Sequence, residues 1–145
     1  MSTMSIAGRV ARPLLGAMFI SGGLDAIENP EGKVKAADKV AGPISERFSL
    51  LPDDTANVVR INGAVQLVAG VMLSMGILRR TAAAVLVGSL VPTTVAGHRF
   101  WEELDETARK QQVIHFLKNL SMLGGLVLAA TEPRARKRRR SNRSA

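Results

Sequence analysis

At 145 residues the chain is long enough for one domain. Aromatic residues make up only 3% of it and cysteine is absent, which excludes disulfides, thiol redox chemistry and thiolate metal sites. The net charge of +8 reflects mainly a basic segment at the carboxyl end, so it does not indicate a nucleic-acid-binding domain.

Four apolar stretches alternate with charged connections, which predicts an all-α integral membrane protein built as a four-helix bundle. The membrane domain is expected at residues 13–131. Its helices are predicted at 13–27, 58–78, 81–97 and 112–131. These segments are rich in small residues, as helices packed together in lipid tend to be. A soluble helical bundle is the alternative reading. Its surface helices would need a regular polar stripe, which these segments lack.

The first apolar stretch follows Arg9 and Arg12, in residues 1–12, which are predicted to be a cytoplasmic amino terminus. No clean cleavage site follows the stretch, and three more apolar segments come later, so it is interpreted as a membrane helix and not a signal peptide. Pro13 suits the first helical turn. A helix over 13–27 spans roughly 22 Å, short of a ~30 Å hydrocarbon core, so Arg12 is expected to snorkel toward the headgroups.

The long connection between the first two membrane helices carries its own apolar periodicity. Its spacing predicts a short amphipathic helix on the membrane surface, with Pro43 at its start and Pro52 at its end. The residues that set this spacing are Ile44, Phe48 and Leu51.

The later connections are shorter. Arg79 and Arg80 are predicted to form a tight turn between the second and third membrane helices. Trp101, beside Phe100, is expected at the level of the membrane interface. Aspartates are expected to cap two helices: Asp53 or Asp54 the second membrane helix, and Asp105 a long helix that continues through the fourth.

Four crossings put both termini on one side of the membrane, and the arginines of the short turn favour the cytoplasmic side. The protein is therefore predicted to lie in a membrane with both ends in the cytoplasm. Residues 132–145 are predicted to be a disordered tail that binds anionic lipid; docking to an acidic protein or nucleic acid is the alternative. The basic residues assigned to lipid contact are Arg134, Arg136, Lys137, Arg138, Arg139 and Arg140.

Polar residues gather at the outer ends of the four predicted helices. They predict a ligand pocket in the outer leaflet, closed below by an apolar floor. The alternative reading is an ion pair between Asp25 and Lys118 that holds the bundle together, with the amide side chains as interhelical glue. The candidate ligand-binding residues are Asp25, Asn62, Gln66, His98, His115, Lys118 and Asn119.

Two cofactor readings carry less support. His98 and His115 are the only histidines, and they would have to ligate a haem from helix ends. The acidic loop that follows His98 reads better as a solvated loop than as a metal site, and no metal is predicted. The chain has no glycine-rich phosphate loop, nucleophile elbow or zinc motif.

Several stretches resemble the DoxX family of small bacterial membrane proteins, over roughly residues 9–131. The loop Glu28-Asn-Pro-Glu resembles actinobacterial members. Many members carry a lysine near the end of the first helix, where this chain has Asp25. The matching stretches are Arg12-Pro-Leu-Leu-Gly, Phe19-Ile-Ser-Gly-Gly, His98-Arg-Phe-Trp and Gln112-Val-Ile-His-Phe-Leu-Lys-Asn-Leu-Ser-Met-Leu-Gly-Gly.

The resemblance implies a four-helix subunit of the bacterial plasma membrane that supports the redox or oxidative-stress chemistry of a partner, with a quinone or a similar lipid-like molecule as the expected ligand. It points to a non-catalytic subunit more than to a complete enzyme. The expected partners are membrane lipid, a soluble redox enzyme or membrane complex, and further copies of the chain. The alternatives are a structural or assembly scaffold without ligand chemistry and, third, a small-solute transporter.

Overall fold

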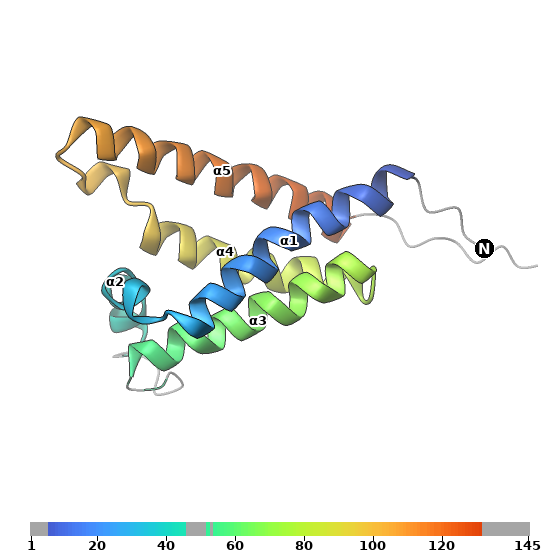
Figure 1. Ribbon diagram of the computed structural model, residues 1–145, viewed down its shortest axis with the longest axis horizontal. Helices are drawn as coiled ribbons and strands as arrows, with labels where there is room; N and C mark the ends of the chain where they lie inside the picture. Colours follow the sequence, from blue (N-terminus) through green and yellow to red (C-terminus); the bar gives the residue numbers. More distant parts are fainter. Residues whose placement is uncertain (1–5, 46–51, 53, 132–145) are drawn as a thin grey trace, which may run out of the picture.

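The computed structural model describes residues 6–45, 52 and 54–131 (Figure 1). These residues form helices and no strand, which confirms the predicted all-α class. The elements in chain order are α1 (Ile6–Glu28), α2 (Glu31–Ser45), α3 (Thr55–Met75), α4 (Arg79–Gly97), the short 3-10 helix η1 (Phe100–Glu102) and α5 (Glu106–Thr131).

Four of these helices, α1, α3, α4 and α5, are long and apolar enough to cross a membrane. The shortest has 19 residues and spans about 28 Å, close to the thickness of a hydrocarbon core. Large apolar side chains cover their outer surfaces, including Leu14, Val68 and Leu128, which are 68%, 59% and 71% exposed. Such a surface is suited to lipid and not to water.

The first helix is longer than its sequence indicates. α1 begins at Ile6, seven residues before the predicted start, and runs through Pro13. Its 23 residues span about 34 Å, enough for a full crossing. Arg12 is only 7% exposed and lies against Gly76, so it packs inside the protein where snorkelling toward headgroups was expected. The predicted start rested on proline's preference for a first turn, whereas Pro13 lies in the interior of α1.

The connection between α3 and α4 also differs from its prediction. α3 ends at Met75, and Gly76 adopts a left-handed conformation with φ of 73°. The N–H groups of Gly76 and Ile77 donate to the carbonyls of Leu73 and Met72, the Schellman pattern that ends many helices. The turn therefore occupies residues 76–78, and the two arginines expected in it lie in the first turn of α4.

A helix does occupy the connection between α1 and α3, but earlier than expected. α2 starts after Pro30 and contains Pro43 near its end, whereas Pro43 was predicted to start the surface helix. Phe48 and Leu51, which set the predicted periodicity, lie outside the described residues. The expected caps are present: Asp54 accepts from the N–H of Ala56 (2.9 Å), and Asp105 accepts from the N–H of Ala108 (2.7 Å).

α1 and α3 form the closest helix pair, because glycines face one another between them. Gly16 and Gly23 of α1, one heptad apart, lie against Gly70 and Gly63 of α3, also one heptad apart. A Cβ atom at Gly23 would lie 2.5 Å from the carbonyl oxygen of Gly63. Small residues let helix backbones approach in lipid, and here the approach leaves no space for a methyl group.

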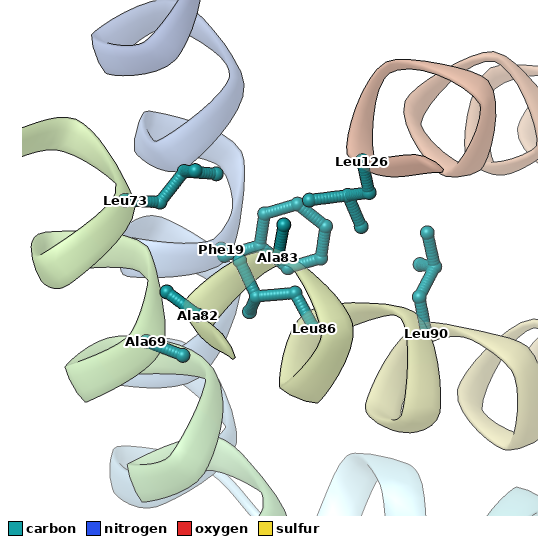
Figure 2. Packing of buried hydrophobic residues seen from close by; sticks show 8 residues of the cluster. All are labelled: Phe19, Ala69, Leu73, Ala82, Ala83, Leu86, Leu90 and Leu126. Carbon is teal, nitrogen blue, oxygen red and sulfur yellow. The ribbon is translucent and has the colours of Figure 1, made fainter. Parts of the chain in front are cut away.

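The core joins all four long helices (Figure 2). Phe19 of α1 and Leu126 of α5 meet the α4 side chains, and Leu86 and Leu126 are completely buried. Yet α5 is the least enclosed helix, with 17% of its span buried against 33% for α3 and for α4. The cluster comprises Phe19, Ala69, Leu73, Ala82, Ala83, Leu86, Leu90 and Leu126.

The two ends of the bundle differ, and we name them here. The loop end carries α2 and η1, and the terminal end carries the start of α1, the α3–α4 turn and the end of α5 (Figure 1). At the terminal end, Nε of Arg80 donates to the carbonyl oxygen of Ala130 (2.8 Å). A cation at the last carbonyls of a helix complements its dipole, so Arg80 ties the end of α5 to the start of α4.

Candidate functional site

Two amide side chains of α3 bind hydroxyl groups of α4. Nε2 of Gln66 donates to the hydroxyl of Ser89 (2.9 Å), which donates in turn to Oδ1 of Asn62 (2.7 Å). Nδ2 of Asn62 donates to the hydroxyl of Thr93 (3.3 Å). Asn62 and Gln66 stand four residues apart on one helix face, and this spacing matches Ser89 and Thr93 on the partner.

A second polar contact joins α4 to α5. Nδ2 of Asn119 donates to the hydroxyl of Thr94 (3.0 Å), and both residues are buried. Toward the loop end, Nδ1 of His98 lies 2.9 Å from Oε1 of Gln112. The ring of His98 also stacks on that of His115, with centroids 5.4 Å apart.

These contacts form one polar belt across α3, α4 and α5 in the half of the bundle nearer the loop end. Every fully buried side-chain nitrogen or oxygen of the described residues has a hydrogen-bond partner. Polar groups in lipid associate because no water is present to satisfy them. Asn62, Gln66 and Asn119 are therefore held by neighbouring helices, an arrangement that fits the reading of these amides as interhelical glue.

Lys118 stands apart from this belt. It is exposed, and it makes no hydrogen bond or ion pair with the described part of the chain. Residues seven apart share a helix face, so Lys118 lies on the same strip of α5 as Gly125 and Gln111. A Cβ atom at Gly125 would lie 3.4 Å from Leu15, so this strip is the one that faces α1.

α1 and α5 meet only toward the terminal end. They are close where Leu15 faces Gly125, and they diverge toward the loop end, where α5 stays with α4 (Figure 1). The α1-facing strip is consequently covered at Gly125 but exposed at Lys118 and Gln111. His115, three residues before Lys118 on a neighbouring line of the helix, is exposed as well.

Asp25 does not pair with Lys118. Its carboxylate accepts from Lys33 and from Nδ2 of Asn29 (3.1 Å). The chain turns at Pro30 and starts α2, and this reversal brings Lys33 back to the end of α1. The ion pair considered from the sequence is therefore replaced by a local one, and Asp25 lies at the loop end, away from the belt.

The structure also shows the arrangement of the residues considered for a haem and for a metal ion. The rings of His98 and His115 stack with 21° between their planes, an arrangement that leaves no room for a macrocycle between them. In the acidic loop, Oε1 of Glu102 accepts from Nη1 of Arg99 (2.6 Å) and Oε2 accepts from Nζ of Lys39 (2.5 Å). The described residues contain no group of three or more histidine, aspartate and glutamate side chains placed to hold a metal ion.

Some residues that take part in these contacts were not predicted from the sequence, and some predicted residues lie outside the part of the chain that the structure describes. Ser89 escaped notice, although it stands four residues before Thr93, a spacing that places both hydroxyls on one face. Gln112 and Lys33 were also missed. Gln112 stands three residues before His115 on α5, whereas Lys33 lies on α2, which carries no predicted site residue. The tail residues assigned to anionic lipid lie outside the described residues.

The DoxX family model matches residues 9–99, which is more than half of the chain and contains α1 to α4 except the first residues of α1. No curated protein and no solved structure matches the chain at a significant level. Because the match ends at Arg99, the α5 residues His115, Lys118 and Asn119 lie beyond it.

Proposed function

The chain belongs to the DoxX family of multi-pass membrane proteins, and from that premise we propose that it is a subunit that binds a quinone or a similar lipid-like molecule. The ligand binds on the exposed α1-facing strip of α5. A partner enzyme carries out the redox or oxidative-stress chemistry that the bound ligand supports. The observation that carries this proposal is Lys118, which is exposed on a membrane-spanning helix and has no partner among the residues that the structure describes.

A lysine without a partner among the described residues makes the insertion of a membrane helix less favourable. On insertion scales a lysine at the helix centre costs about 2.5–3.5 kcal/mol, and snorkelling lowers this cost near the ends. A ligand carbonyl that accepts a hydrogen bond from Nζ lowers it further. Lys118 lies on the flank where α1 has diverged from α5, so a membrane-dissolved ligand reaches it from the lipid without crossing the bundle.

His115 is the second ligand contact in this proposal. It lies one turn from Lys118 toward the loop end, and its ring remains exposed beside that of His98. An imidazole ring can exchange a proton with a ligand oxygen. A bound quinone would supply two-electron, two-proton redox chemistry, with its electrons from the partner enzyme. His115 would pass one of the two protons to a ligand oxygen, and water at the bundle surface would supply the other.

The belt residues take a supporting role. Asn62 and Gln66 are bonded to Ser89, and Asn119 is bonded to Thr94, so their polar atoms already have partners. They hold α4 between α3 and α5 and thereby fix the side of α5 that faces the ligand. Asp25 and His98 likewise act at the loop end, through Lys33 and Gln112.

We also propose that both termini face the cytoplasm of a bacterial cell. The first turn of α4 carries Arg79 and Arg80, and residues 134–140 are strongly basic. The positive-inside rule assigns such short basic connections to the cytoplasm. The terminal end is then cytoplasmic, and Lys118 and His115 lie in the half of the bundle toward the outer leaflet.

The test is mass spectrometry of the organic extract from full-length protein purified gently from its native membrane. Lys118→Met is compared with Lys110→Met, the same change on the same helix at a lysine that pairs with Glu106. We expect a quinone at near-equal molar amount in the wild type and in Lys110→Met, and its loss in Lys118→Met. Equal retention in all three proteins would rule out the role of Lys118, provided that each elutes as a folded particle.

A scaffold without ligand chemistry is the second candidate. It is favoured by the belt, whose buried polar atoms are all satisfied, and by the broad exposed apolar face of α5. In that case the extract contains only bulk phospholipid. Proteins that co-purify with the wild type are then lost after substitutions on the exposed face of α5, such as Leu117→Asn and Leu128→Asn.

A further inference from the structure

A polar hollow of about 360 Å³ lies at the loop end, apart from the α5 strip. One wall is a strip of α2 that carries Lys35 and Lys39. The opposite wall is the end of α4 and η1, with Arg99, Glu102 and Glu103. The hollow thus holds three basic and two acidic side chains, and an excess of one positive charge.

The charges in the hollow are unequally matched. Glu102 accepts from both Lys39 and Arg99, so one carboxylate balances two cations. Lys35 makes no hydrogen bond or ion pair within the described part of the chain. The excess positive charge is therefore available to a ligand, and Lys35 is exposed and not engaged by a carboxylate of the described residues.

The position of the hollow limits what reaches it. It lies where α4 ends, and its lining residue Glu102 follows the exposed Trp101 in the chain. Tryptophan near a helix end marks the membrane interface, the level of lipid headgroups. The anions present there are the phosphates of lipid headgroups and phosphate from the aqueous phase.

We propose that this hollow binds a phosphate group, with Lys35 as its direct contact and Arg99 and Lys39 as flanking cations. The guanidinium of Arg99 keeps N–H groups beyond the Nε and Nη1 donors used by Val95 and Glu102. Glu103 opposes binding. It is paired with no cation among the described residues, and its one hydrogen bond is a long contact of 3.4 Å from the N–H of Asp105. The site is independent of the α5 strip, so either proposal can fail alone.

Trp101 is the only tryptophan in the chain, and it lies between Arg99 and Glu102. Its fluorescence serves as the probe, because Glu102, the next residue in the chain, lines the hollow. The full-length protein in neutral detergent is titrated with inorganic phosphate, with short-chain phosphatidylglycerol and with short-chain diacylglycerol. Saturable change with phosphatidylglycerol but not with diacylglycerol supports the site. If inorganic phosphate competes with phosphatidylglycerol, a free anion is a sufficient ligand. If it does not compete, the ligand is the lipid headgroup.

Three substitutions test whether the phosphate group binds in the hollow. Lys35→Gln should weaken binding by about fivefold, and Glu103→Gln should strengthen it by about fivefold, as expected for one charge near a membrane surface. Lys110→Gln removes a lysine outside the hollow and should leave binding unchanged. Equal weakening by Lys35→Gln and Lys110→Gln, or no saturable change with either phosphate ligand, would overturn the proposal.

Discussion

Gly23 and Gly63 face each other across the α1–α3 contact, and a Cβ atom on either would lie within 2.8 Å of the other's carbonyl oxygen. We expect Gly63→Ala to push the two helices apart and to cost about 1–3 kcal/mol of stability, as overpacking does. Thermal unfolding in detergent measures the loss. Gly88→Ala is the matched control, because a Cβ atom at Gly88 meets nothing within 4 Å. Equal midpoints for the two variants would contradict the close approach.

The bond between Asn119 and Thr94 predicts coupled losses. Thr94→Val and Asn119→Leu each leave one buried polar group without its partner, and the double variant leaves neither. We expect a coupling energy of about 0.6 kcal/mol, the average for hydrogen bonds between membrane helices. A double-mutant cycle of unfolding free energies measures it. Ser121→Ala combined with Thr94→Val should be additive, since the hydroxyl of Ser121 bonds only within its own helix.

The partner of Asp25 can be identified in the same way. Asp25→Asn and Lys118→Met should have additive effects on the unfolding midpoint, because the structure pairs Asp25 with Lys33. Asp25→Asn and Lys33→Gln should be non-additive, and their coupling should fade in high salt because both side chains are exposed. Coupling between positions 25 and 118 would restore the ion pair considered from the sequence.

Asp105 sets the start of the last helix. Its carboxylate accepts from the N–H of Ala108, so Asp105→Ala should cost about 1 kcal/mol, the usual value of an N-cap. Asp105→Asn retains an oxygen acceptor and should cost little. Amide hydrogen exchange in the first turn of α5 should rise in the alanine variant alone. A rise in both variants would mean that the charge matters more than the hydrogen bond.

Hydropathy and capping residues predicted most of the fold. Long uncharged runs favour membrane helices because each backbone group must be satisfied within its own segment. Asp54 and Asp105 cap the helices they were expected to cap, because capping depends only on neighbours in the chain. Two helix boundaries were predicted wrongly: Pro13 lies inside α1, and α3 ends at the left-handed Gly76, three residues before the predicted turn.

The candidate site was predictable as a set of residues but not as a set of contacts. Helical spacing placed Asn62 with Gln66 on one face, and the structure keeps them together. Which residue each one meets depends on how far the helices approach and rotate, and one sequence does not contain that information. Lys118 shows the limit, because its exposure results from the divergence of α1 and α5 and not from any local pattern.

The hydrogen bond from Arg80 to Ala130 couples the end of α5 to the start of α4 at the terminal end. Ala130 is the next-to-last residue of α5 and Arg80 lies in the first turn of α4, so a displacement of one helix end acts on the other. The next residues along α4 are Ala82, Ala83 and Leu86, which belong to the core. A displacement at the end of α5 is thus carried along α4 into the centre of the bundle.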